Sequence, residues 1–301
     1  QIGRMMTNSD LHATASRFKH AKNLDDVDPE DFAWAVPIMR AGYAGRALVY
    51  LVVAGVSLWS IFQGGEAEGT KSAMQSLDGP IGVIIIIAIA AGLFAYAVWR
   101  LIDSFWDLEA YGTSAKGIIA RIGMVVTGVV HGAIGVIAIT ALGYASSGSK
   151  GQKLLSDFMQ STLGSWVVTI AGLLTVATGI YYFYKAISQN YRDHLQANHF
   201  TMHWNFLLRA GLAAQGATVM IIGGLIAYSG LSSNSSGAGG LGTAFDWLKD
   251  QAFGNILVIL LCLGLLGFSL FCMVNAFYRI IPKAADPSVE SMAYKVQQLA
   301  S

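Results

Sequence analysis

The chain has 301 residues, of which 54% are hydrophobic and only 12% are charged, and its formal net charge is +1. The charged fraction is about half that of an ordinary soluble domain, so most of the surface cannot face water and the bilayer is the expected solvent. No basic stripe suited to a phosphate backbone is present, which excludes a nucleic acid as the expected partner.

Six long uncharged tracts follow one another along the chain. A helix needs about 20 mostly apolar residues to cross a hydrocarbon core of about 30 Å, and the strand-like alternation of a membrane barrel is absent from the sequence. We therefore predict an all-α integral membrane protein with six transmembrane helices. The tracts are residues 47–65, 79–99, 122–149, 158–184, 210–245 and 251–278.

The first, third and fifth predicted helices begin with the same pattern, an Arg followed two residues later by a Gly. The three copies begin at Arg40, Arg121 and Arg209. A second recurring Gly, at Gly82 in the first copy, follows the leading Arg by 42, 43 and 45 residues and marks the start of the next helix. This periodicity predicts three tandem two-helix units, which enter the membrane from the same side and are therefore parallel repeats about an axis near the membrane normal.

The connector between the two helices of each unit is expected on the outer side. Its later part has the composition of a short amphipathic helix that lies along the interface. The three connectors are residues 66–78, 146–161 and 232–252.

The distribution of Lys and Arg predicts the orientation, because short cytoplasmic loops carry the excess of these residues. With the N-terminus inside, fifteen of the nineteen fall in or beside the cytoplasm and four fall outside. Both termini are therefore expected to be cytoplasmic. The predicted organisation is a polar cytoplasmic N-terminal tail at 1–39, repeats at 40–110, 111–195 and 196–284, and a cytoplasmic C-terminal tail at 285–301.

Three motifs carry a resemblance to a known family over residues 40–280. They are Arg-x-Gly-Tyr-Ala-x-Arg-x-x-Val-Tyr at 40–50, Pro-x-Gly at 80–82 and Gly-Leu-Phe-Ala-Tyr-Ala-Val-Trp-Arg at 92–100. Together they resemble the bacterial membrane family known as the domain of unknown function numbered 1206. The resemblance implies three two-helix repeats and a bacterial cytoplasmic (inner) membrane, and it implies no activity, substrate or cofactor.

Alignment of the second helices of the three units places Asp103, Lys185 and Asn275 at one equivalent position. If these faces point at the pseudo-threefold axis, the three side chains can meet as a hydrogen-bonded binding cluster, which is how charges usually survive in a membrane. The alternative, which we favour, is that each side chain reaches the interface separately.

The leading arginines Arg40, Arg121 and Arg209 recur by the same symmetry. Basic residues at this depth can hold anionic lipid headgroups. More often they only anchor the topology, and we favour that interpretation.

Histidines suggest two further sites. His131 lies within the third tract and could ligate haem iron or relay protons, but no second histidine lies at matching depth in another tract, so a polar residue hydrogen-bonded between helices is the preferred interpretation. His199 and His203 are four residues apart, near His194, in the connector between the fourth and fifth tracts. Without an acidic or cysteine partner at a firm interval they predict loop histidines, so we predict no metal site and no cofactor.

The function follows from what the tracts lack. No catalytic pair or phosphate-binding loop can be assembled, so we do not expect an enzyme. The preferred hypothesis is a structural or accessory subunit of a larger membrane complex, with membrane lipids and other membrane-protein subunits as partners. The alternative is a small-solute transporter or channel with a path along the pseudo-threefold axis, for which few intramembrane charges are available.

Overall fold

The computed structural model describes residues 33–77, 79–144, 156–233, 238–281, 291–292, 294–295 and 298. Within these ranges, six helices are long and apolar enough to cross a membrane, which confirms the predicted fold class. Most of the predicted tails at 1–39 and 285–301 lies outside the described residues. The six helices are α2 (Ala35–Phe62), α4 (Gly79–Trp106), α5 (Ala115–Ile139), α7 (Thr162–Ser188), α9 (Asn205–Ser232) and α11 (Gly254–Tyr278).

Helices α2, α5 and α9 begin earlier than the uncharged tracts suggest, because arginine is a good helix former and does not end a helix. Helix α2 starts at Ala35, so that both Arg40 and Arg46 lie inside it. The starts of α5 and α7 are fixed by serine caps, since the hydroxyls of Ser114 and Ser161 accept hydrogen bonds from backbone N–H groups three residues on.

The fifth tract, predicted as 210–245, contains two helices in place of one. Helix α9 ends at Ser232, and the short helix α10 (Leu241–Lys249) follows after a Gly- and Ser-rich stretch. Helix α10 and its counterpart α3 (Thr70–Gln75) are the short helices expected in the connectors. In the remaining connector, residues 156–159 are helical and 146–155 lie outside the described residues.

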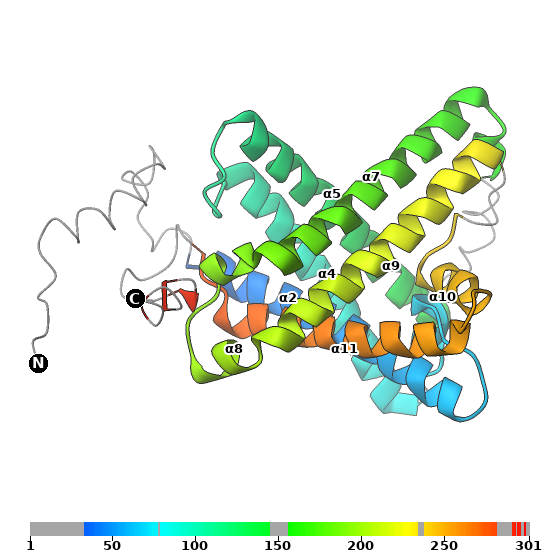
Figure 1. Cartoon of the computed structure of the whole chain (residues 1–301), viewed down its shortest axis with the longest axis horizontal. Coiled ribbons are helices and arrows are strands. Elements are labelled where there is room, and N and C mark those ends of the chain that lie inside the picture. Colours follow the sequence, from blue (N-terminus) through cyan, green and yellow to red (C-terminus); the bar gives the residue numbers. More distant parts are fainter. Residues whose placement is uncertain are drawn as a thin grey trace, which may run out of the picture.

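The tightest packing joins the second helix of one unit to the first helix of the next. This gives the pairs α4/α5, α7/α9 and α11/α2, the last of which returns from the third unit to the first. In Figure 1, α2 in blue and α11 in orange lie side by side, and the green and yellow pair α7/α9 runs obliquely across them. The three units are therefore linked in a cycle.

Packing within a unit differs between the repeats. Helices α2 and α4 pack together, as do α9 and α11, whereas α5 and α7 do not pack along one another. The surroundings of the glycines at equivalent positions show the same difference in packing between the repeats. A methyl group on Gly42 would lie 2.6 Å from the Cα of Tyr96, and one on Gly211 would collide with the backbone of Gly267, but one on Gly123 would meet nothing within 4 Å. We call the unpacked line between α5 and α7 the α5/α7 seam.

The two ends of the body differ in polarity. We call the end where α2, α5 and α9 begin the arginine end, and the opposite end, which carries α3 and α10, the connector end. Toward the connector end the helices enclose an apolar cluster. Its fully buried members include Val53, Ala54, Met74, Ile89, Phe245, Cys262 and Leu265.

Candidate functional site

A buried ionic network occupies the arginine end. Arg100 Nη1 lies 3.1 Å from Asp103 Oδ2 and 3.6 Å from Glu109 Oε1. Arg279 Nε donates to Glu109 Oε1 at 3.1 Å, its Nη2 pairs with the same oxygen, and its Nη1 donates to Asn275 Oδ1 at 2.7 Å. We call these five residues the arginine-end network. It connects α4, the loop after α4 and the end of α11.

The loop between α4 and α5 is folded so that Glu109 points into this network. The carboxylate of Asp107 accepts hydrogen bonds from the backbone N–H groups of Tyr111 and Gly112, at 2.8 and 2.7 Å. Asp103 Oδ1 accepts from the backbone N–H of Glu109 at 3.2 Å. These bonds satisfy loop donors and fix the loop, so that the Glu109 side chain is nearly inaccessible, with 1% of it exposed.

The charge of Glu109 is set by two arginines. Burial alone would raise the pKa of this carboxyl, but Arg279 and Arg100 outweigh burial and hold the pKa of Glu109 well below its usual value. Glu109 in turn holds the pKa of Arg279 above its usual value, against the effect of burial. Both groups are therefore ionised at every physiological pH, and the pair is a permanent feature of the fold.

Tyr96 extends the network toward the middle of the membrane. Its hydroxyl accepts hydrogen bonds from Arg100 Nε and from Arg46 Nη1, both at 2.9 Å. Arg46 is 4% exposed, and it lies 11 residues beyond the start of α2, about 16 Å along the helix axis. Arg46 is therefore enclosed by the helices, and its place among the residues counted in or beside the cytoplasm stays a prediction. Its aliphatic stem and ring contacts let a charge lie at this depth.

The predicted cluster of Asp103, Lys185 and Asn275 is only partly assembled. Asp103 and Asn275 belong to the same network and are joined through its arginines. Lys185 lies within electrostatic range of Glu109 and Arg279, but it forms no ion pair or side-chain hydrogen bond with a described residue. A binding role for the three remains a prediction.

Two of the three leading arginines bond to the end of the preceding helix, and the third is exposed. Arg121 donates to the backbone carbonyls of Ser104 and Phe105, at 2.6 and 3.1 Å, and Arg209 donates to that of Ala186 at 3.2 Å. Each thus satisfies carbonyls at the end of the preceding helix, which have no partner within that helix. Arg40 is exposed. Their proposed contact with lipid headgroups remains a prediction.

His131 bonds within its own helix and not between helices as expected. Its Nδ1 lies 2.7 Å from the carbonyl oxygen of Thr127, one turn earlier in α5. The ring packs edge-on against Tyr96, with 4.7 Å between the ring centroids. Nε2 is buried and has no hydrogen-bond partner among the described residues.

The loop histidines form a small surface cluster. The rings of His199 and His203 stack with 5.8 Å between their centroids. Across the described ranges there is no group of three or more His, Cys, Asp or Glu side chains placed to hold a metal ion.

We expect His194 to make the stability of the protein depend on pH. Burial, reinforced by the nearby Arg279, lowers the pKa of His194 to about 4. Between pH 6.5 and pH 4 the unfolded state binds a proton that the folded state does not, so we expect stability to fall as the pH falls through this window, by up to about 3 kcal/mol. We expect the melting temperature in detergent to fall between pH 6.5 and 4.5 in the wild type. His194→Gln should remove most of this slope, and an unchanged slope would assign it to other groups.

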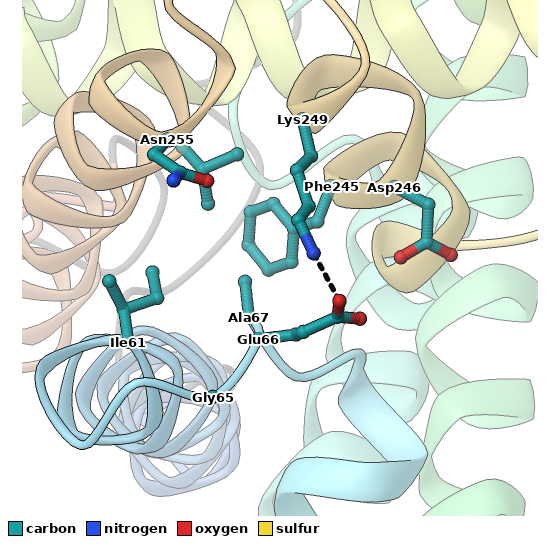
Figure 2. Close-up of a pocket in the computed structure, with 9 residues that line it drawn as sticks. Ile61, Gly65, Glu66, Ala67, Phe245, Asp246, Lys249 and Asn255 are labelled. Atoms are coloured by element: carbon teal, nitrogen blue, oxygen red, sulfur yellow. Dashed lines mark hydrogen bonds and ion pairs between the residues drawn. The ribbon is translucent and has the colours of Figure 1, made fainter.

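One surface pocket lies at the connector end (Figure 2). It has an empty volume of about 300 Å³ and is lined by nine residues. Lys249 of α10 reaches Glu66, which follows α2, and the two form an ion pair with side chains 42% and 68% exposed. Since an exposed ion pair contributes little binding energy, this pocket is a weaker candidate than the buried network.

Sequence reasoning missed Glu109, Arg279 and Arg46. Arg46 carried a signal, since it is the second arginine of the opening motif and a long uncharged tract follows it directly. Glu109 and Arg279 are 170 residues apart, and nothing in their local sequence indicates that they meet.

These features define a class of protein: a polytopic helical membrane protein made of three two-helix repeats around a buried charged network. Comparison with known proteins gives the particular family. The chain belongs to the family described as Domain of Unknown Function (DUF1206), which matches it at residues 41–107, 122–189 and 210–279, one segment for each repeat. This confirms the resemblance seen in the sequence.

A relative in Bacillus subtilis (strain 168) is described as uncharacterized protein YxxB. It is 21% identical over 262 residues, which cover 85% of this chain and 95% of the relative. No solved structure matches the chain.

Proposed function

We propose that the protein is a non-catalytic component of the membrane that binds anionic lipids at its arginine end and serves as an accessory subunit. The observation that carries this proposal is an excess of buried positive charge. Three cations lie near two carboxylates, and a fourth, Arg46, is joined to them through the Tyr96 hydroxyl, which leaves a formal surplus of two positive charges. The cations are Arg46, Arg100, Lys185 and Arg279, and the carboxylates are Asp103 and Glu109.

A surplus of charge in a low-dielectric environment favours a partner of opposite sign. Lys185 is the side chain best placed to meet that partner, because its pairing capacity is unused among the described residues. It lies in the last turn of α7, beside the lipid surface, where phosphate headgroups are abundant.

The distribution of polar side chains favours binding over transport. The hydrogen-bonded and ion-paired side chains that start at Glu109 end at Arg46 and its neighbours. Between Arg46 and the connector end, the interior is filled by the apolar cluster around Val53 and Leu265. A hydrophilic solute would find hydrogen-bonding groups over only part of its path. We therefore favour the accessory role over a transporter or channel.

The proposed location is the bacterial inner membrane, with the arginine end and both termini in the cytoplasm, as the excess of Lys and Arg favours. Single cysteines placed at Glu66 and at Arg192 test the orientation. A membrane-impermeant thiol reagent added to intact cells should label the first and not the second. The reverse labelling would contradict the proposed orientation.

Lipid titration tests the headgroup site. We expect the delipidated wild-type protein to bind phosphatidylglycerol more tightly than phosphatidylcholine when the complexes are measured by native mass spectrometry. Lys185→Gln should weaken phosphatidylglycerol binding by about fivefold, since one basic residue near the headgroups contributes about 1 kcal/mol. Lys249→Gln removes a lysine that already pairs with Glu66 at the other end, and it should change nothing. Equal effects of the two substitutions would contradict the site.

A further inference from the structure

Accessible cations at the arginine end outnumber accessible carboxylates. Six Lys and Arg side chains at this end are exposed or half-exposed and form no ion pair with a described residue: Arg40, Lys116, Arg121, Lys185, Arg192 and Arg209. Among the described residues, Asp107 and Asp193 are the accessible carboxylates at the same end, and Asp107 already accepts two backbone hydrogen bonds. This face therefore attracts an anionic partner.

The chain leads into this end through an acidic stretch. Residues 1–32 lie outside the described residues, and the part nearest the body reads Asn-Leu-Asp-Asp-Val-Asp-Pro-Glu-Asp at 23–31. We call residues 25–31 the acidic segment. It carries five carboxylates and no Lys or Arg, so its charge is opposite to that of the face where α2 begins.

The start of α2 is packed against the arginine-end network. Ala35 is fully buried in the same apolar cluster as Leu108 and Ile281. Leu108 is followed by Glu109, and Ile281 lies two residues after Arg279. In Figure 1 the start of α2, in blue, and the end of α11, in orange, lie at the same end of the body. The chain that leads into α2 therefore arrives beside the network.

The length of the acidic segment lets it reach across this face. Asp31 lies four residues before Ala35, and Asp25 lies ten residues before it. Extended chains of these lengths span at most about 14 and 36 Å, whereas neighbouring packed helices lie about 8–10 Å apart. A partner joined by a short linker acts at an effective concentration on the order of millimolar, so pairs that are weak individually suffice to hold it.

We infer that the acidic segment docks on the arginine end and that Lys185 is among the cations with which it pairs. Lys185 lies within electrostatic range of Glu109 and Arg279, the pair beside which the segment is tethered. The docked segment occupies the place of anionic headgroups and is therefore an intramolecular competitor of lipid. This competition rests on the headgroup site proposed above, whereas the docking itself does not.

Carbodiimide cross-linking tests the docking directly. The reagent joins a carboxylate to an amine where the two are in contact, and it is applied to the full-length protein in a mild detergent before digestion and mass spectrometry. We expect amide links from the acidic segment to Lys185 and none to Lys71 at the connector end. The link between Lys249 and Glu66 is the internal control, because these side chains already form an ion pair.

The wild-type protein alone decides this test, so the folding of a variant does not enter. Formation of the control link without any link from the acidic segment to Lys116 or Lys185 would overturn the docking. Links to Lys116 alone would place the segment away from the headgroup site and would overturn the competition.

Isotope mixing separates the chain's own acidic segment from that of a second copy. An equal mixture of ¹⁵N-labelled and unlabelled protein is cross-linked in the same way. We expect linked peptides with both halves labelled or both unlabelled. Mixed pairs at the frequency of random association would make the occupant a second copy and would contradict intramolecular docking.

Neutralising the acidic segment tests the competition with lipid. The variant carries Asp25→Asn, Asp26→Asn, Asp28→Asn, Glu30→Gln and Asp31→Asn. We expect it to bind phosphatidylglycerol about fivefold more tightly than the wild type in native mass spectrometry, since one charge near the headgroups contributes about 1 kcal/mol.

The matched control changes the net charge equally at the connector end. It carries Glu66→Gln, Glu68→Gln, Asp157→Asn, Asp246→Asn and Asp250→Asn. This control should bind phosphatidylglycerol as the wild type does, and an equal gain in both variants would assign the effect to net charge and overturn the competition.

The docking and the headgroup site fail separately. If the wild type and the neutralised variant both lack a preference for phosphatidylglycerol while the links to Lys185 remain, the headgroup site is wrong and the docking stands. If the wild type prefers phosphatidylglycerol but no link to the acidic segment forms, the headgroup site stands and the docking is wrong.

Discussion

Glu109→Gln is expected to lower the free energy of unfolding by about 3–5 kcal/mol, the largest effect of any single substitution at the arginine end. The carboxylate holds Arg279 and is 3.6 Å from Arg100, and both arginines are at most 14% exposed. Without it, two buried guanidinium groups lose their shared counter-charge in a low-dielectric environment, where such a loss is most costly. Thermal or denaturant unfolding in a mild detergent measures the change.

Glu66→Gln is the matched control, because Glu66 also forms an ion pair between distant segments. Its pair with Lys249 is exposed, and its loss should cost at most about 1 kcal/mol. A second comparison is the double substitution Glu109→Gln with Arg279→Met, which removes the orphaned cation and should recover part of the loss. Equal effects of Glu109→Gln and Glu66→Gln would mean that water reaches the arginine-end network.

Gly42→Ala should destabilise the protein by about 2 kcal/mol, whereas the same change at the equivalent position of the second repeat, Gly123→Ala, should stabilise it by up to about 1 kcal/mol. At Gly42 the added methyl group would lie 2.6 Å from the Cα of Tyr96, and a backbone cannot rotate away as a side chain can. At Gly123 it meets nothing within 4 Å, so only the gain in helix propensity remains.

Melting temperatures of the two glycine variants, measured side by side, test this prediction. The comparison needs no external control, since the sequence repeats align the two positions and only the tertiary structure separates them. A similar loss at both positions would mean that α5 and α7 close against one another, and the α5/α7 seam would not exist.

The number and kind of helices could be predicted from residue order because each long tract must satisfy its own backbone in lipid, whatever its neighbours. The repeats could be predicted for a related reason: Arg-x-Gly recurs because each copy needs close packing or a cap for the preceding helix. The leading Arg could be recognised by its recurrence, but its bonds to the carbonyls of Ser104 and Ala186 could not.

Only part of the arginine-end network could be predicted from the sequence. Asp103 and Asn275 were found by alignment, which grouped Lys185 with them, but the ion-pair partner of Asp103 is Arg100, three residues away on the same helix. A neighbour in the helix is reached at almost no entropic cost, and it competes well with a residue on another helix.

The sequence by itself determined the six spans and their pairing into three units, because these depend on length, hydropathy and recurrence along one chain. Only the tertiary structure decided that Glu109 and Arg279 meet, that Arg46 lies between Tyr96 and Phe268, and that the second repeat is left unpacked. These features depend on contacts between residues far apart in the chain, where a few ångströms separate a closed interface from an open one. The pattern of residues within one segment does not indicate such distances.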